Sequence, residues 1–177
     1  MTSEVQKRAA RIKLLLMDCD GVLTDGRVWI FEYGEEQKGF YTRDGLGIDL
    51  LHRAGLRSGI ISGRTSKAVE TRARTLGMSF VVQGHENKVQ AFAGVLAQAG
   101  VSNAEVAYIG DDLNDIPLMV QSGLGVAVAD AALETREHAH YVTKAPGGFG
   151  AVREVIELLL KSQGRWDDLI KKYLAAD

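Results

Sequence analysis

Short apolar runs alternate with helix-length segments along most of this chain. The runs are rich in aliphatic residues and end in polar residues or glycine; they cover residues 12–17, 56–62, 80–83, 105–110 and 124–128. Continuous apolar runs of this length are typical of strands buried on both faces of a parallel sheet. The intervening patterns predict helices over residues 44–54, 66–76, 87–99 and 113–122. This alternation predicts an α/β fold with a doubly wound parallel sheet.

One segment, residues 26–43, interrupts the alternation after the first predicted strand. Its sequence, GRVWIFEYGEEQKGFYTR, has strand-like pieces at 28–31 and 38–42 on either side of a turn that contains glycine. This pattern predicts a β-hairpin that projects from the sheet. Because the hairpin carries five aromatic residues, we expect it to dock on another surface.

The end of the chain is a helical tail. Residues 149–177 contain two amphipathic patterns, GAVREVIELLLKSQG and RWDDLIKKYL, which predict two helices. No repeat, low-complexity tract or linker divides the 177 residues. The sequence therefore indicates a single domain over residues 1–177.

Composition argues against several classes of protein. The net charge of −2 argues against a nucleic-acid or membrane surface held by bulk electrostatics. No apolar stretch approaches the roughly 20 residues that span a bilayer. Cys19 is the one cysteine, which excludes an internal disulfide framework. With no visible signal peptide, we expect a cytoplasmic protein.

Polar residues follow the predicted strands at the point where each strand ends. Asp18 and Asp20 follow the first strand, Ser62 ends the second, and Asp111 follows the fourth. Ligands of open α/β sheets bind at the carboxyl ends of the strands, so we expect these side chains to converge. Converging carboxylates raise each other's pKa values, and a divalent cation removes that repulsion. Oxygen ligands with room for water and phosphate suit Mg²⁺.

The same residues suit phosphoryl transfer. Asp18 can attack phosphorus and form an aspartyl phosphate, and Asp20 can protonate the leaving oxygen and later accept a proton from water. The hydroxyls of Ser62 and Thr65 lie at a strand-to-helix turn suited to phosphate. Lys88, at the start of a predicted helix, supplies positive charge for the phosphoryl oxygens. Taken one at a time, these residues could be a turn residue, a loop hydroxyl or a solvated lysine with no catalytic role. The order in which all of them occur along the chain favours a phosphate-binding catalytic site.

In this order the motifs resemble those of the haloacid dehalogenase superfamily of phosphatases. The stretches DCDGVLTDG, ISGRT, NK and GDDLND match its four motifs. The resemblance implies that Asp18 is the nucleophile and Asp20 the general acid and base. It also implies Mg²⁺ held by the Asp18 side chain, the Asp20 backbone carbonyl and Asp111. Asp115 would then lie in the outer shell and Asp112 near the waters of the metal.

A narrower resemblance is to the 3-deoxy-D-manno-octulosonate 8-phosphate phosphatases, small capless enzymes of lipopolysaccharide sugar biosynthesis. The hairpin, RDGLGIDLL, VVQGHENK and GGFGAVREVIELLLKSQG carry it. It implies a homotetramer in which the hairpins assemble and a neighbour's C-terminal segment helps close each active site. The insertions in this chain are too short for a cap domain, so a partner subunit would have to exclude water.

Arg64, next to Gly63 in SGRT, bears on the substrate. A guanidinium beside the phosphate site can pair with the carboxylate of a sugar acid or with the phosphate. Nonulosonate 9-phosphate phosphatases tend to carry an acidic residue there, so the resemblance favours the eight-carbon acid. Phe149 stands where arginine is common in the narrower family, which leaves the exact sugar acid open. Arg72, on the same predicted helix, is read here as a surface arginine, with the border of a neighbouring pocket as the alternative.

These observations predict a Mg²⁺-dependent phosphatase that acts on the phosphomonoester of a small sugar acid. The alternatives are a nonulosonate 9-phosphate phosphatase and a capless phosphatase of broader or macromolecular specificity. A scaffold protein without turnover is a further alternative, but it usually lacks a nucleophile or a metal ligand, and none is missing here.

Overall fold

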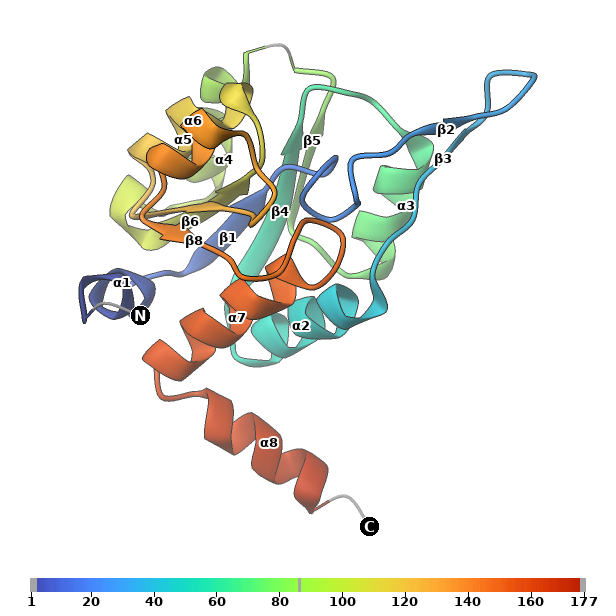
Figure 1. Cartoon of the computed structure of the whole chain (residues 1–177). Coiled ribbons are helices and arrows are strands. Elements are labelled where there is room, and N and C mark those ends of the chain that lie inside the picture. The colour runs from blue at the N-terminus through green and yellow to red at the C-terminus, as the bar shows by residue number, and fades with distance from the viewer. Residues whose placement is uncertain (1–2, 86, 176–177) are drawn as a thin grey trace.

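A six-stranded parallel sheet forms the centre of the computed structural model, which describes residues 3–85 and 87–175 (Figure 1). Its strands lie in the order β5-β4-β1-β6-β7-β8. They are β1 (Leu14–Met17), β4 (Arg57–Ser62), β5 (Phe80–Gln83), β6 (Val106–Gly110), β7 (Leu124–Ala127) and β8 (Tyr141–Val142). The five predicted strands are confirmed. β8 was not predicted, because two residues are too few to show a pattern.

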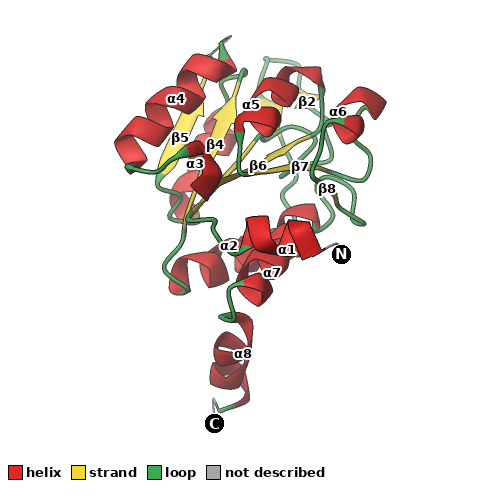
Figure 2. Ribbon diagram, turned by 90° about the vertical axis from the view of Figure 1, so that its left-hand side faces the viewer, coloured by secondary structure: helices red, strands yellow, loops and turns green. Residues whose placement is uncertain are grey.

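Helices cover both faces of the sheet, which confirms the doubly wound fold. In Figure 2, α1, α2 and α7 lie on one face and α4 and α5 on the other. The helices are α1 (Ser3–Ala9), α2 (Thr42–Arg53), α3 (Lys67–Thr75), α4 (Lys88–Ala99), α5 (Ile116–Gln121), α6 (Leu133–Glu137), α7 (Ala151–Ser162) and α8 (Trp166–Leu174). Two 3₁₀ turns, η1 (Asn103–Glu105) and η2 (Leu113–Asp115), join them. Among the described residues, no helix is long and apolar enough to cross a membrane.

Strand β1 is the point where the direction of winding reverses. It pairs with β4 on one side and with β6 on the other, so that Leu14 lies opposite both Arg57 and Val106. All four of its residues are buried, because helices cover both faces of the sheet. A crevice forms at the carboxyl end of a strand in this position. The fold therefore places the residues that follow β1 at the bottom of such a crevice.

The predicted hairpin within residues 26–43 is present, but its second strand lies earlier than expected. It consists of β2 (Trp29–Ile30) and β3 (Glu36–Gln37), which pair in antiparallel register. The turn closes with the amide of Phe31 donating to the carbonyl of Glu35 at 3.0 Å. The second strand expected at 38–42 was wrong, because α2 already begins at Thr42.

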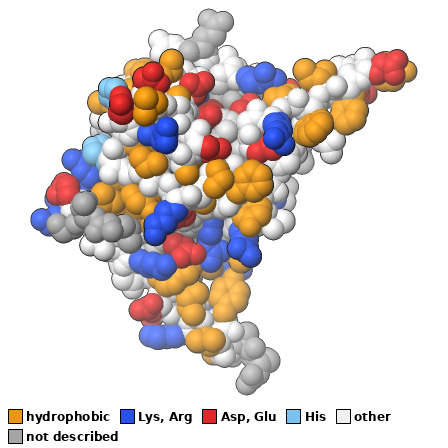
Figure 3. All heavy atoms as spheres, viewed as in Figure 1, with side chains coloured by type: hydrophobic (Ala, Val, Ile, Leu, Met, Phe, Trp, Pro, Cys, Tyr) orange, Lys and Arg blue, Asp and Glu red, His pale blue; other side chains and the backbone are white. Residues whose placement is uncertain are grey.

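The hairpin projects from the body of the molecule (Figure 1) and carries a row of apolar side chains (Figure 3). Its exposed large side chains are Trp29, Ile30, Phe31 and Tyr33. Within the described residues, only this hairpin follows β1 and only a short turn follows β4. The fold is therefore capless, as expected, and the crevice at the strand ends is open on one side.

The small residues before α7 pack against the loop that follows β1. The amide of Gly148 donates to the carbonyl of Val22 at 2.9 Å. A Cβ on Gly147 would lie 1.7 Å from the carbonyl oxygen of Gly21, so only glycine fits this approach. Beyond α7, the tail helix α8 extends away from the body (Figure 1).

Asp44 links α2 to the start of α7. Its Oδ1 accepts a hydrogen bond of 2.7 Å from the amide of Arg153, in the first turn of α7. A carboxylate in this position satisfies an amide that has no partner within the helix. Asp44 is 1% exposed, and this burial raises its pKa to about 6 against the opposing effect of the backbone amides and of Arg153 and Arg72.

This raised pKa predicts a pH-dependent contribution of Asp44 to stability. The native carboxyl holds its proton up to about pH 6, whereas the unfolded chain releases it near 3.8. The contribution is fully present below the unfolded value and is lost as pH rises through the folded value, a change of about 2–3 kcal/mol. Urea unfolding of wild type and Asp44→Asn with chelator at about pH 4.5 and 7.5 measures it. The variant should gain stability relative to wild type at the higher pH; a difference independent of pH would contradict the assignment.

Candidate active site

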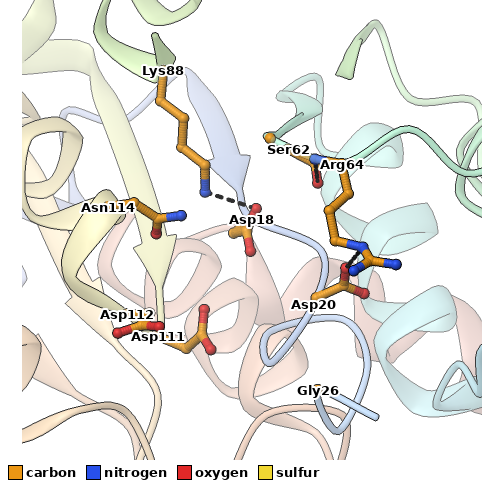
Figure 4. Close-up of a pocket in the computed structure, with 10 residues that line it drawn as sticks. Asp18, Asp20, Gly26, Ser62, Arg64, Lys88, Asp111, Asp112 and Asn114 are labelled. Carbon is orange, nitrogen blue, oxygen red and sulfur yellow. Dashed lines mark hydrogen bonds and ion pairs between the residues drawn. The ribbon is translucent and has the colours of Figure 1, made fainter. Parts of the chain in front are cut away.

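A pocket of about 230 Å³ lies at the carboxyl ends of β1, β4 and β6 (Figure 4). Its lining residues are Asp18, Asp20, Gly26, Ser62, Gly63, Arg64, Lys88, Asp111, Asp112 and Asn114. The fold thus brings together seven of the eight residues that the sequence identified for catalysis, substrate and metal. The exception is Thr65, whose Oγ1 lies so close to Gly84 that a Cβ there would be 2.6 Å away. A substrate contact by Thr65 stays a prediction.

Lys88 lies between two buried carboxylates. Its Nζ donates hydrogen bonds to Asp18 Oδ1 at 3.0 Å and to Asp115 Oδ1 at 2.8 Å. Burial by itself lowers the pKa of Lys88, but the charges of Asp18 and Asp115 outweigh it and raise the pKa above its ordinary value. Lys88 is therefore an ammonium fixed beside the carboxylate of Asp18.

Asp115 is buried next to the pocket and accepts hydrogen bonds from several groups of the site. Besides Lys88, its Oδ1 accepts a hydrogen bond from the buried Tyr108 hydroxyl at 2.8 Å. Its Oδ2 accepts the amides of Asp111 at 3.2 Å and Asp112 at 3.4 Å. Both oxygens are engaged within the protein. This arrangement fits an outer-shell role, in which Asp115 fixes Lys88 and the loop that carries Asp111.

The carboxylates of Asp18, Asp111 and Asp115 crowd together, with oxygen atoms within 4.8 Å of one another. Burial, followed by the charge of Asp115, raises the pKa of Asp18 to about 6 and that of Asp111 to about 8. The backbone also approaches closely, because a Cβ on Gly21 would lie 2.0 Å from Asp111 Oδ2. Two crowded carboxylates that resist ionisation fit a divalent cation of the hard, oxygen-binding kind. Since Asp115 is already engaged, Asp18 and Asp111 are the side chains that fit this ion.

The turn between β4 and α3 forms the opposite wall of the pocket. Ser62 ends β4 and is buried, and its Oγ accepts the amide of Arg64 at 3.3 Å. The Arg64 side chain is 55% exposed and reaches toward Asp20 (Figure 4). A hydroxyl, a glycine amide and a guanidinium at a strand-to-helix turn suit an anionic ligand.

Sequence reasoning missed Gly26 and Asn114, which line the pocket, and Lys38, which contacts Asp20. Asn114 lines the pocket from the GDDLND turn, in which only the aspartates were predicted to be site residues. Lys38 reaches from the hairpin to Asp20 Oδ1, and its side chain is only 1% exposed. No sequence pattern shows that a lysine in a strand-like segment will be buried against a carboxylate.

Two neighbouring residues bear on earlier expectations. Cys19 is buried, as expected, and burial raises the pKa of its thiol far above its ordinary range, so the thiol is unreactive. The interpretation of Arg72 as a surface arginine was wrong. Its guanidinium carbon lies 5.7 Å from the centre of the Phe40 ring, and its Nε is buried.

Comparisons with known proteins agree with this geometry. Residues 59–156 match the family described as haloacid dehalogenase-like hydrolase. The chain is 45% identical over 168 residues to the 3-deoxy-D-manno-octulosonate 8-phosphate phosphatase of Escherichia coli strain K12, covering 95% of this chain and 89% of that protein.

Solved structures show the same likeness. The phosphatase of that name from Moraxella catarrhalis, in complex with magnesium, phosphate and KDO (3-deoxy-D-manno-octulosonate), has a TM-score of 0.95 at 40% identity and covers 98% of this chain and 99% of its own. A probable YrbI family phosphatase from Pseudomonas syringae has a TM-score of 0.97 at 45% identity, covering 99% and 100%. The chain therefore belongs to the haloacid dehalogenase-like hydrolases and is a phosphatase similar to the 3-deoxy-D-manno-octulosonate 8-phosphate phosphatases.

Proposed function

We propose that the protein hydrolyses 3-deoxy-D-manno-octulosonate 8-phosphate to KDO and phosphate in a Mg²⁺-dependent reaction. The observation that carries this proposal is the convergence of Asp18, Lys88 and Asp111 on one pocket. Relatives at 40–45% identity over nearly the whole chain bear the name of this activity. One of them holds magnesium, phosphate and KDO together.

Asp18 is the nucleophile in this proposal. It lies at the end of a buried strand, and the hydrogen bond from Lys88 at 3.0 Å orients its carboxylate. Its attack on phosphorus forms an aspartyl phosphate and breaks the bond to the sugar oxygen. Asp20 protonates that oxygen, then accepts a proton from the water that hydrolyses the aspartyl phosphate. Lys88 stabilises the negative charge on the phosphoryl oxygens.

Asp18 and Asp111 would hold Mg²⁺ together with the backbone carbonyl of Asp20. When bound, the ion supplies charge that neutralises the crowded carboxylates and the phosphate. Asp115 keeps the loop of Asp111 in place through the two backbone amides it accepts. Asp112 and Asn114 line the same side of the pocket.

The affinity for Mg²⁺ should rise steeply with pH. Asp111, with a pKa of about 8, and Asp18, with a pKa of about 6, must lose their protons to bind the ion. At about pH 6 nearly all of the metal-free Asp111 is protonated, so affinity should be on the order of 10²-fold weaker than at pH 8.5. Titration calorimetry in two buffers of different ionisation enthalpy measures both the affinity and the protons released. Equal affinity at the two pH values, with no proton release, would contradict this ligand assignment.

Arg64 supports the choice of a sugar acid. Its Nη2 pairs with Glu36 of the hairpin at 3.2 Å, and more than half of its side chain is exposed at the pocket. A substrate carboxylate could take the place of Glu36 on this guanidinium.

The substrate is tested by measuring kcat/KM for the eight-carbon acid phosphate, a nine-carbon analogue and common sugar phosphates with Mg²⁺. The proposal expects a clear preference for the eight-carbon acid. Similar values for all of them would remove this substrate and leave a general phosphatase.

We also propose that the protein is a homotetramer whose neighbouring subunits complete each site. Apolar side chains are exposed on the hairpin, and Tyr173 and Leu174 are exposed on α8. Groups of exposed apolar side chains such as these mark interaction sites. Light scattering should give a mass about four times the 19.2 kDa of the chain. A stable monomer would oppose the proposal and favour a macromolecular substrate.

A further inference from the structure

A closed ring of four charged side chains joins the base of the hairpin to the pocket. Lys38 Nζ contacts Asp20 Oδ1, and it also lies 3.0 Å from Glu36 Oε1. Glu36 Oε2 lies 3.2 Å from Arg64 Nη2, and Arg64 Nε lies 3.5 Å from Asp20 Oδ2. Signs alternate around the ring, so each charge has two neighbours of opposite sign. Figure 4 shows the Arg64–Asp20 side of this ring within the pocket.

Lys38 is buried in a way that only its partners explain. Its side chain is 1% exposed, although it comes from a hairpin that is otherwise largely exposed. Burying an ammonium is costly unless opposite charges and hydrogen bonds surround it. Burial lowers the pKa of Lys38, but the contacts with Asp20 and Glu36 outweigh it and raise the pKa, so the amine stays protonated.

The two oxygens of Asp20 differ in their surroundings. Oδ1 accepts a hydrogen bond from Lys38. Oδ2 is buried and has no hydrogen-bond partner among the described residues, although Arg64 lies 3.5 Å away. A buried carboxylate oxygen without a partner is uncommon, because it gives up hydration without replacement. Lys38 thus anchors Oδ1, while Oδ2 lies against the guanidinium of Arg64, which is itself more than half exposed at the pocket.

We propose that Lys38 is a positioning residue that holds the carboxyl group of Asp20 by Oδ1 and so fixes its orientation at the pocket. This inference rests on the proposed function, in which Asp20 is the general acid and base. In the first step of that function, Asp20 as the general acid gives a proton to the sugar oxygen while the bond between that oxygen and phosphorus breaks. In the second step, Asp20 takes a proton from the water that attacks the aspartyl phosphate. Lys38 keeps all of its protons throughout.

The test compares two leaving groups in the variant Lys38→Met. The alcohol of a sugar phosphate leaves only with a proton, whereas nitrophenolate leaves from p-nitrophenyl phosphate without one. In single-turnover experiments with Mg²⁺, release of the sugar alcohol should slow by roughly 10–100-fold, the scale expected for a misplaced catalytic group. Release of nitrophenolate in the same turnover should change less than about threefold. Equal slowing of both would indicate general damage to the site and overturn the proposal.

A double-mutant cycle separates positioning from structure. If Lys38 acts through Asp20, then Lys38→Met should cost nothing further in an Asp20→Asn background. Additive losses would overturn the proposal. Lys38→Arg keeps the charge and should recover part of the sugar-phosphate rate, and it also serves if the methionine variant does not fold. Lys7→Met, at an exposed lysine of α1, is the matched control and should leave both rates unchanged.

The same data distinguish this inference from the proposed function. The substrate preference of the wild-type protein tests the function, and the comparison can use any alkyl phosphate that it hydrolyses. The release rate of the Lys38→Met variant relative to wild type, compared between the two leaving groups, tests the role of Lys38 alone.

Discussion

Asp18→Asn should abolish turnover while leaving the fold intact. The amide cannot act as a nucleophile toward phosphorus, so kcat should fall by roughly 10⁴-fold or more, as expected for loss of a covalent nucleophile. Lys88 keeps its second partner, Asp115, at 2.8 Å in the variant. The neutral side chain also removes a carboxyl whose pKa burial has raised to about 6. The melting temperature without Mg²⁺ should therefore stay equal or rise.

Steady-state phosphate release and thermal melting of the same sample measure both effects. Asp49→Asn is the matched control, because Asp49 pairs with Arg53 on the surface of α2 at 2.8 Å and lies outside the pocket. This control should keep the wild-type rate. If Asp18→Asn retained more than about a hundredth of the wild-type rate, the aspartyl-phosphate mechanism would be wrong.

Lys88→Met should damage both catalysis and stability. Removing the ammonium takes away the charge beside the phosphoryl oxygens, which should lower kcat by roughly 10²–10³-fold. It also leaves Asp18 and Asp115 buried without their cation. Breaking a buried ion pair from one side costs about 3–5 kcal/mol of the free energy of unfolding. This cost should be smaller near pH 5, where the raised pKa of Asp18 allows that carboxyl to be neutral.

Urea unfolding at two pH values and steady-state kinetics test this prediction. Lys171→Met, which removes an exposed pair with Asp168 on α8, should change stability by less than about 0.5 kcal/mol. A Lys88→Met variant with wild-type kcat would show that the phosphoryl charge is stabilised elsewhere. One with wild-type stability would show that Asp18 and Asp115 do not depend on this cation in the native protein.

The core of the fold and much of the pocket could be predicted because both depend on local pattern. Strands buried on both faces appear as continuous apolar runs, and their ends identify one edge of the sheet. Asp18, Ser62 and Asp111 each follow or end such a run, and all three line the pocket. Lys88 could be predicted as a site residue because it lies at the start of a predicted helix and occupies the position of the third phosphatase motif.

The remaining features depend on contacts that no local pattern encodes. Lys38 is 18 residues from Asp20, and only the path of the hairpin brings the two together. The predicted position of β3 was wrong because a strand of two residues has no detectable periodicity. In addition, α2 begins at Thr42, inside the segment predicted to be a strand. Arg72 was expected at the surface, but its guanidinium lies over the ring of Phe40, in the segment between β3 and α2.

The sheet and the hairpin contribute different groups to the pocket. The sheet places the first of these groups: Asp18 and Ser62 are buried at the ends of β1 and β4, and Asp111 directly follows β6. The hairpin brings Lys38 and Glu36 to Asp20 and Arg64, the groups assigned to proton transfer and substrate choice. Assembly of hairpins between subunits would therefore act directly on those two groups.

Phosphate release from 3-deoxy-D-manno-octulosonate 8-phosphate by the wild-type protein, with Mg²⁺ and with excess chelator, tests the proposed reaction most directly. We expect rapid release with Mg²⁺, loss of release with chelator, and full recovery when Mg²⁺ is restored. Release that continues unchanged in chelator would contradict the metal site formed by Asp18 and Asp111. No release under any of these conditions, from a folded protein that hydrolyses other phosphomonoesters, would contradict the substrate.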